Sequence, residues 1–271
     1  SKFTEAADTY LHAAEDATAD MRSTLHYNAA IAYYRDGKYE DAANLLRQLS
    51  SITPEPDPDI TTTLALTLYQ QAQQIQADNT TNATLKAELL NEAAEIFGEA
   101  LRGNPNSESL RHDTELAAGR HRQAKQQAKE MQLLAKYANQ PPAAIMNQML
   151  KRERSIITRM QAAFTNDSPE QIRQLEELAE EQNKTADLWI PLNRHMSSAA
   201  TGTNQAIAAQ IASLQQHSDS TQEQMRQTAH HLENLDPVAY EKAVAAEARI
   251  YNFWKQMAPY AQLLDEDIRR Q

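Results

Sequence analysis

The sequence predicts an all-α protein, in which a short irregular array of helical hairpins and a long capping helix precede a C-terminal helical bundle. Composition is the first reason, because the 271 residues include only 5 Gly and 10 Pro and 41% of them are apolar. Apolar side chains also recur three and four positions apart, with almost no strand-like alternation. Finally, one pattern of small residues occurs in more than one helical segment. Together these features favour regular helical structure with a core of its own.

The segment from residue 25 to residue 54 predicts an antiparallel helical hairpin. An apolar face marks its first helix, Asp36-Gly37 interrupts the helical pattern, and Pro54 ends a second helix. The small pairs Ala29-Ala30 and Ala42-Ala43 occupy matched places in the two helices, so we expect the two backbones to approach closely there. Larger side chains fill the flanking space, namely Tyr33, Tyr39 and Leu46.

The same spacing resembles the tetratricopeptide (TPR) repeat, whose pattern is W-x2-L-G-x2-Y…A-x3-F…P. Here it runs His26-x2-Ala29-Ala30-x2-Tyr33…Ala42-x3-Leu46…Pro54. His26 stands where the repeat usually has Trp and Ala30 where it usually has Gly, but the spacing is unbroken. The resemblance implies a repeat architecture that binds other proteins.

Two further segments carry parts of this pattern. The segment 93-AAEIFGEALRGNP-105 repeats the spacing of the second helix, from Ala93 through Phe97 to Pro105. The segment 1-SKFTEAADTYLHAA-14 repeats it with Ala6, Tyr10 and Ala13, preceded by Phe3 where the hairpin has Tyr39. This opening segment resembles the second helix of a repeat whose first helix is missing. We therefore expect the chain to be part of a longer protein.

The later repeat predicts a first helix over residues 60–77, with Asp59 at its N-cap, and a partner helix from near Leu85 after the polar connection 78-DNTTNATL-85. After Pro105, residues 107–138 contain no helix breaker and predict one long helix that caps the array. This helix resembles the one that follows the TPR in bacterial Bat (aerotolerance) operon proteins, where a segment like 108-ESLRHDTELAAGR-120 leads into a Gln/Lys-rich run such as 123–129. The resemblance extends from Ser23 to about Lys136.

A domain boundary is predicted at Pro141-Pro142, because the residue before a proline is disfavoured in helical conformation. We accordingly expect two domains, residues 1–139 with the repeats and capping helix and residues 140–271 with the helical bundle. Ser168 and Asp236 are each followed by proline and predict capped helix starts, and Pro191 predicts a kinked or split helix. The expected helices are 143–165, 169–189, 192–216, 220–234 and 237–257, with a short one from Ala258. Trp189 and Trp254 are predicted to anchor the bundle core, with a partner-binding role as the alternative.

Charge is unevenly distributed along the chain. The stretch from Arg111 to Arg159 contains ten Lys/Arg and four acidic residues, so the net charge of −11 comprises +6 there and −17 elsewhere. A solvated helix face and an electropositive stripe for an acidic partner both explain this stretch. Nucleic acid is not an expected partner, because the stretch lacks interleaved aromatic residues and the acidic remainder repels phosphate.

The sequence predicts neither a bilayer-spanning segment nor a disulfide. Its longest apolar run, Ala29 to Tyr34, is far shorter than the roughly 20 residues that a spanning helix needs. There is no cysteine, which excludes thiolate nucleophiles and is compatible with the cytoplasm or the periplasm. We expect a periplasmic or envelope-associated protein, with a cytoplasmic location as the alternative. An anchor or signal segment outside this sequence is compatible with either.

Sequence patterns of catalytic and metal sites are absent. There is no phosphate-binding glycine loop and no G-x-S-x-G nucleophile turn. None of the eight histidines has an acidic residue three positions before it, and no two histidines are four positions apart. We therefore expect no catalytic residue, no metal and no cofactor. An enzyme of unrecognised type is the third class of function, after a binding protein and a structural subunit.

In TPR proteins the first helix of each hairpin lines a concave surface that holds a peptide or a partner helix. By this resemblance the groove-facing residues are Tyr27, Asn28, Ile31, Tyr34 and Arg35. Asn28 stands where members that bind a peptide carboxylate often carry Asn, but the companion lysines are not evident. The alternative is that these side chains face solvent or contact neighbouring repeats.

We therefore expect a non-catalytic interaction or scaffold protein that binds a protein or peptide partner of unknown identity on its concave repeat surface. The alternative function is a structural subunit of a bacterial envelope assembly that self-associates through the C-terminal bundle.

Overall fold

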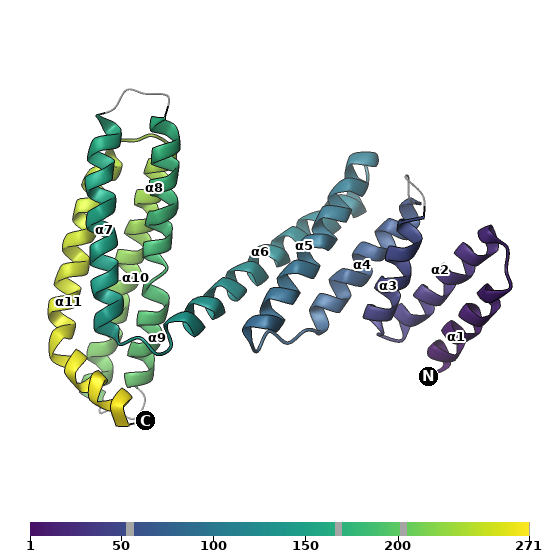
Figure 1. Cartoon of the computed structure of the whole chain (residues 1–271), viewed down its shortest axis with the longest axis horizontal. Helices are drawn as coiled ribbons and strands as arrows, with labels where there is room; N and C mark the ends of the chain where they lie inside the picture. Colours follow the sequence, from purple (N-terminus) through teal and green to yellow (C-terminus); the bar gives the residue numbers. More distant parts are fainter. Residues whose placement is uncertain (53–56, 166–169, 201–204, 271) are drawn as a thin grey trace. The chain divides into compact units, whose positions relative to one another are not determined.

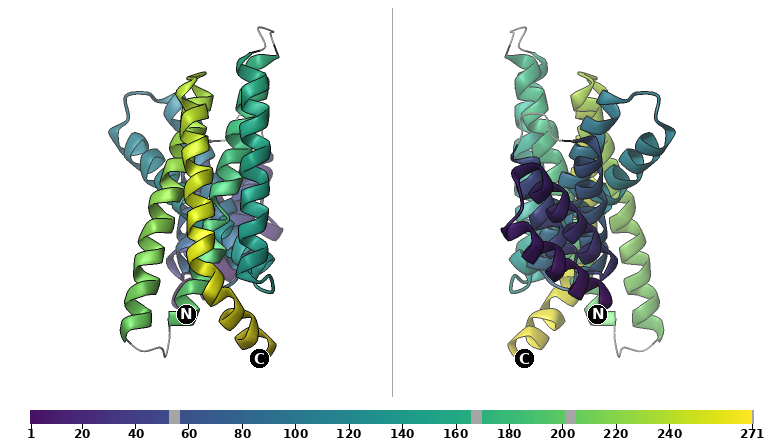
Figure 2. Two further views of the ribbon diagram at one scale, coloured as in Figure 1. Left: turned by 90° about the vertical axis from the view of Figure 1, so that its left-hand side faces the viewer. Right: turned by 90° about the vertical axis from the view of Figure 1, so that its right-hand side faces the viewer.

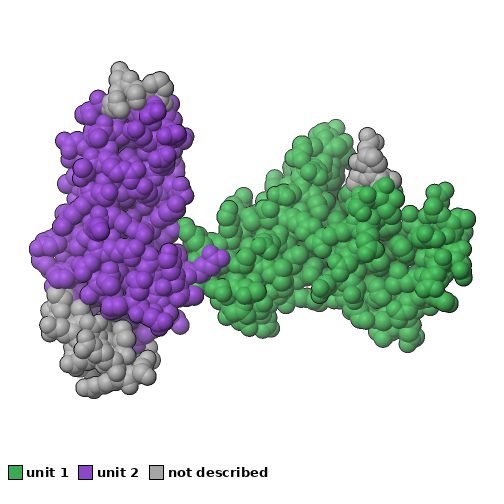
Figure 3. Space-filling view, viewed as in Figure 1, with its two compact units in different colours: residues 1–131 green, residues 132–271 purple. Residues whose placement is uncertain are grey.

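The computed structural model describes residues 1–52, 57–165, 170–200 and 205–270, with side chains up to Met257 in the last range. These residues form eleven helices and no strand, so the predicted all-α class is confirmed. The chain divides into two compact units, Ser1–Met131 and Gln132–Gln271 (Figure 3). The predicted boundary between residues 139 and 140 lies in the connection after the helix Glu108–Tyr137, whereas the two units divide within that helix.

Unit 1 is an array of helices in which each of the first five packs against its neighbour along the chain (Figure 1). The helices are α1 (Lys2–Glu15), α2 (Ala19–Arg35), α3 (Tyr39–Ser50), α4 (Pro58–Gln74), α5 (Thr80–Gly103) and the first part of α6 (Glu108–Tyr137). α6 joins the array through the buried Ala117 and Ala124, and through His121, whose Nδ1 lies 3.0 Å from the carbonyl oxygen of Ala87. The long helix expected after Pro105 is therefore present.

The array has two layers, because contacts connect every second helix. The Tyr27 hydroxyl of α2 lies 3.1 Å from the Thr63 hydroxyl of α4. Arg47 of α3 donates two hydrogen bonds, of 3.0 and 2.7 Å, to the carboxylate of Glu92 in α5. α2 and α4 thus lie in one layer, and α3 and α5 in the other.

The hairpin of α2 and α3 has the close crossing that its small residues predicted. Ala29-Ala30 and Ala42-Ala43 are fully buried. Between the helices, Gly37 has φ 75°, and Lys38 N–H donates to the carbonyl of Tyr33 at 3.0 Å across the turn. This is the left-handed helix end that glycine adopts without a steric penalty. Pro54, predicted to end the second helix, lies outside the described residues.

Two predicted helix starts in the next hairpin are wrong. The N-cap of α4 is Asp57 rather than Asp59, because the Asp57 carboxylate accepts from the N–H of Asp59 at 2.8 Å and Pro58 occupies the first turn. α5 begins at Thr80 rather than near Leu85, because the Asn79 side chain accepts from the N–H of Asn82 at 2.9 Å. Capping by Asn79 thus makes helical a stretch that was predicted as a polar connection.

Unit 2 is a bundle in which four long helices lie side by side and one short helix joins two of them (Figures 1 and 2). Its helices are α7 (Pro142–Phe164), α8 (Gln171–Ala186), α9 (Trp189–Ala200), α10 (Gln205–Glu233) and α11 (Val238–Arg270). α11 includes both predicted segments, 237–257 and the one from Ala258. Asp236 caps it as predicted, accepting from the N–H of Val238 at 3.0 Å. The predicted start at Ser168 lies outside the described residues.

The predicted division into helices 192–216 and 220–234 is wrong, since α10 continues through residues 217–219. Its polar stretch is buried, and its hydroxyls have partners there: Ser218 lies 2.6 Å from the side-chain oxygen of Asn193 in α9, and Thr221 donates to the carbonyl of His217 at 2.9 Å. Pro191 neither kinks nor splits a helix in the way predicted. The break precedes it, at Asp187 and Leu188, and Pro191 lies in the first turn of α9, where its missing N–H leaves no bond unmade.

Two apolar clusters fill the bundle. In the first, Trp189 is fully buried and meets the edge of Phe253 at 4.9 Å between ring centroids, and Trp254 packs partly buried against the same cluster. In the second, Ile156 and Met160 of α7 pack with Leu175 of α8 and with residues of α10 and α11. Trp189 is therefore a core anchor. Among the described residues, no helix is both long and apolar enough to cross a membrane.

Candidate functional site

Two of the predicted groove residues, Tyr27 and Tyr34, make contacts within the array. The Tyr27 hydroxyl pairs with Thr63 of α4, and the Tyr27 ring packs partly buried against the array core. The Tyr34 ring lies 5.3 Å from that of Tyr39, tilted by 60°. Burial, with a smaller contribution from Tyr39, raises the pKa of the Tyr34 phenol above its usual value of 10.0. Both tyrosines therefore help to fix α2 in place.

The other three, Asn28, Ile31 and Arg35, share the open side of α2. They are spaced three and four positions apart, which places them within about 60° of one another around the helix axis. Asn28 and Ile31 are half-buried and Arg35 is exposed. In the described part of the chain, neither the Asn28 amide nor the Arg35 guanidinium has a hydrogen-bond or ion-pair partner. Both polar groups remain available to a ligand, beside an apolar side chain.

α4 extends this surface, because it lies beside α2 in the same layer. Leu66 and Gln70 follow Thr63 by one and two helical turns, so they lie on the side of α4 that Thr63 turns to α2. Both are half-buried. We call the open side chains of Asn28, Ile31 and Arg35, together with Leu66 and Gln70, the α2–α4 face.

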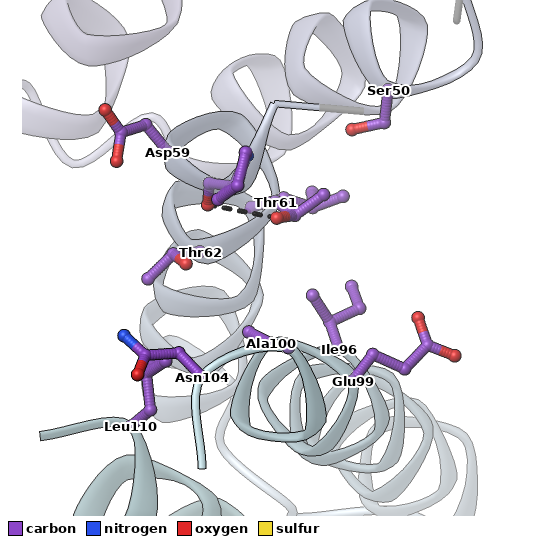
Figure 4. A pocket seen from close by; sticks show the side chains of 12 residues that line it. Ser50, Asp59, Thr61, Thr62, Ile96, Glu99, Ala100, Asn104 and Leu110 are labelled. Atoms are coloured by element: carbon purple, nitrogen blue, oxygen red, sulfur yellow. Dashed lines mark hydrogen bonds between the residues drawn. The ribbon is translucent and has the colours of Figure 1, made fainter. Parts of the chain in front are cut away.

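A second feature is an open hollow of about 770 Å³ at one end of the same unit. It lies among the end of α3, the first two turns of α4, the last turns of α5 and the start of α6. Figure 4 shows Thr61 and Thr62 projecting from α4, and Ile96 and Glu99 from α5, around this space. None of the five predicted site residues lines it.

The lining of the hollow combines apolar walls with hydroxyl groups that bond their own helices. Its apolar walls include Leu64, Ile96 and Leu110. The Ser50 hydroxyl donates to the carbonyl of Leu46 at 2.9 Å and that of Thr61 to the carbonyl of Pro58 at 3.0 Å, so both hydroxyl hydrogens are engaged. Among the described residues that line it there is no histidine, cysteine or lysine, and its two carboxylates, Asp59 and Glu99, accept no hydrogen bond from its hydroxyls.

Sequence reasoning missed this hollow because no local pattern marks it. It forms where the ends of four helices meet, and that meeting depends on how the helices pack rather than on the sequence around any one of them. The cap at Asp57 is the one local signal near it, because it places the start of α4, which lines the hollow.

The cationic stretch also places charge on the array. Arg111, Arg120, Arg122 and Lys125 of α6 are all exposed. Arg111 donates to the carbonyl of Pro105 at 3.1 Å, and Arg120 to the side-chain oxygen of Gln123 at 3.4 Å. Arg111 is thus bonded just before the start of α6, and Arg120 along the surface of that helix. Both contacts are compatible with a solvated helix face and with an electropositive stripe for an acidic partner.

Within the described ranges, no three His, Asp or Glu side chains gather in a way that would hold a metal ion. No family model matches the chain, and no curated protein or solved structure is significantly similar to it. The function is therefore inferred from the sequence and geometry of the chain itself.

Proposed function

We propose that this protein binds a protein partner without catalysing a reaction, and that the α2–α4 face of its helical array is the binding surface. The observation that carries the proposal is the pair of unpartnered polar side chains, Asn28 and Arg35, on one open side of α2 beside Ile31. The resemblance of the hairpin spacing to the TPR repeat supports it, because TPR arrays bind peptides and helices with this helix.

The chemistry of the face indicates what kind of segment it would bind. The guanidinium of Arg35 is a planar donor suited to a carboxylate, and an amide such as that of Asn28 binds peptide backbone groups. Ile31, on α2 with these two residues, and Leu66, on the neighbouring α4, offer an apolar contact. A partner segment with an acidic group next to an aliphatic side chain satisfies all three. We place this protein in the periplasm or at the envelope, because the chain has no cysteine and its repeat and capping helix resemble Bat operon proteins.

Affinity capture from an extract of the organism that encodes the chain tests this function. Wild-type protein is compared with the variants Asn28→Ala and Arg35→Ala, and with Arg120→Ala as a matched control on α6. We expect a partner that the wild type and the control retain and the two α2 variants lose. If every protein recovered with the wild type is recovered equally with Arg35→Ala, the α2–α4 face is not the binding surface.

A structural subunit is the second candidate, and one observation in unit 2 favours it. Val244 and Tyr251 are exposed by 43% and 44% and lie two turns apart on one side of α11. Such a pair is the kind of apolar contact through which bundles self-associate. Light scattering over a range of protein concentrations separates the two functions, because a monomer at every concentration excludes self-assembly through this side.

A further inference from the structure

Two fully buried polar side chains face each other inside the bundle. Glu153 of α7 and Gln182 of α8 each have 0% of their surface exposed. The Nε2 of Gln182 lies 3.0 Å from both carboxylate oxygens of Glu153. Buried acidic residues are rare in proteins unless they are paired, so this position calls for an explanation.

The pair lies between the two apolar clusters of the bundle. Along α7, Leu150 belongs to the first cluster and Ile156 to the second. Along α8, Ala179 belongs to the second and Ala186 to the first. Glu153 and Gln182 therefore form a polar layer in the middle of the bundle, away from the solvent at its ends.

No cation compensates a charge on Glu153 among the described residues. Its neighbour Arg154 turns outward and bonds Glu247 of α11 at 2.7 Å, and the Glu247 carboxylate repels a charge on Glu153. Arg159 of α7 forms an ion pair with Glu181 of α8 at 2.6 Å, so its charge is paired there rather than with Glu153.

No described residue of the remaining helices places a charge beside the pair. On α10, which packs against α8, Arg226 pairs with Asp187 at 2.9 Å. The short α9 contributes the apolar Trp189 and Leu192 to the adjoining cluster. An ionised Glu153 would therefore be a buried charge with one amide as its partner.

The amide has an unsatisfied acceptor, because the Oε1 of Gln182 is buried and accepts no hydrogen bond from the described residues. An ionised carboxylate has no hydrogen to offer it. A protonated carboxyl has one O–H to donate. In the structure Nε2 of Gln182 faces both oxygens of Glu153, and a turn of the amide about its last side-chain bond brings Oε1 to the O–H while Nε2 keeps the other oxygen. One added proton thus satisfies the acceptor of Gln182 and removes the unpaired charge on Glu153 together.

We propose that Glu153 and Gln182 form a proton-binding site inside the C-terminal bundle, and that the bound proton holds α7 to α8. The ligand is a single proton taken from solvent, and the site converts Glu153 carboxylate to neutral carboxyl. The bundle is therefore more stable to unfolding when the proton is bound and less stable when it is released.

The electrostatics of the site agree with this. Burial raises the pKa of Glu153 from 4.5 to about 7, the Gln182 hydrogen bond lowers it by less, and Glu247 raises it further. Since the folded-state pKa lies above the unfolded value, the stabilisation is complete below about pH 4.5 and is lost as the pH rises through about 7. The site therefore responds in the neutral range.

The natural tryptophans make the test specific for the bundle. The chain has two, Trp189 and Trp254, and both lie in unit 2. Tryptophan fluorescence of the full chain during urea unfolding therefore reports the bundle and not the array. Between about pH 5 and about pH 8.5, we expect Glu153 to raise the unfolding constant of the bundle by roughly 70-fold, as linkage predicts for a pKa of 4.5 unfolded and about 7 folded.

The variant Glu153→Gln, compared with the exposed control Glu176→Gln, isolates this contribution. We expect Glu153→Gln to lose most of the pH-dependent change and Glu176→Gln to keep it. Equal pH dependence in the two variants would overturn the proposal.

A ¹³C NMR titration of the side-chain carboxyls in wild-type protein needs no stable variant. It supports the site if a buried glutamate titrates near neutral pH. If every glutamate carboxyl titrates near its ordinary value, the proposal fails.

Discussion

Truncation of Phe97 to alanine tests whether the large side chain at the repeated position of the second helix of each hairpin stabilises the array. Phe97 occupies the same repeat position as Leu46 and Tyr10, but their surroundings differ. Phe97 is 1% exposed and Leu46 is fully buried, whereas Tyr10 of α1 is 36% exposed. Leu46 and Phe97 both belong to the apolar core of the array, whereas Tyr10 does not. Tyr10→Ala is therefore the matched control.

The expected loss follows from burial. Removing a fully buried phenylalanine costs about 3–5 kcal/mol, through lost transfer free energy and the cavity that remains. A domain is typically stable by about 5–15 kcal/mol, so Phe97→Ala removes a large part of the stability of unit 1. Truncating the half-exposed Tyr10 costs about 1 kcal/mol, because much of its ring is already in water.

Urea unfolding followed by two signals separates the units. Far-ultraviolet circular dichroism reports both units, and fluorescence of Trp189 and Trp254 reports unit 2 only. We expect Phe97→Ala to lower the midpoint of the array transition in circular dichroism and to leave the fluorescence midpoint unchanged. Equal small effects of Phe97→Ala and Tyr10→Ala, or a fluorescence midpoint that moves with Phe97, would refute this account of the packing.

Three further changes have expected outcomes. Gly37→Ala forces a side chain into a left-handed turn at φ 75° and should lower array stability by about 1 kcal/mol, whereas unchanged circular dichroism would contradict the turn. Asn79→Ala removes the cap of α5 and should cost about 1 kcal/mol in the same assay, with no loss if α5 begins near Leu85. A double-mutant cycle on Arg47 and Glu92, each about 40% exposed, should give a coupling of about 0.5–1 kcal/mol that falls in high salt, and a coupling that is absent or insensitive to salt would contradict a stabilising ion pair there.

The sequence predicted which segments are helices better than where they end. The hairpin of α2 and α3 was predictable because Ala29-Ala30, Gly37 and Ala42-Ala43 each act locally, through close approach and a left-handed turn. The starts of α4 and α5 were not, since several residues near each start can cap and only the folded backbone shows that Asp57 and Asn79 do so. Boundaries depend on such competition among neighbours.

The candidate site was predictable only as a helix face. Helical geometry places Asn28, Ile31 and Arg35 on one side of α2 without any knowledge of the fold. It does not show that the Tyr27 hydroxyl would reach Thr63, which is 36 residues away in the sequence. The Glu153–Gln182 pair was missed for the same reason, because nothing in a helical pattern distinguishes a buried glutamate from a solvated one until α7 and α8 are packed.

Site-specific photo-crosslinking is the sharpest test of partner binding at the α2–α4 face. A photoreactive amino acid replaces Arg35 in one protein and Arg120 of α6 in another, and each full-length chain is irradiated in an extract of the organism that encodes it. The account predicts a covalent adduct with one partner protein from position 35, and none with that protein from position 120. The same adducts from both positions, or none from position 35, would contradict it.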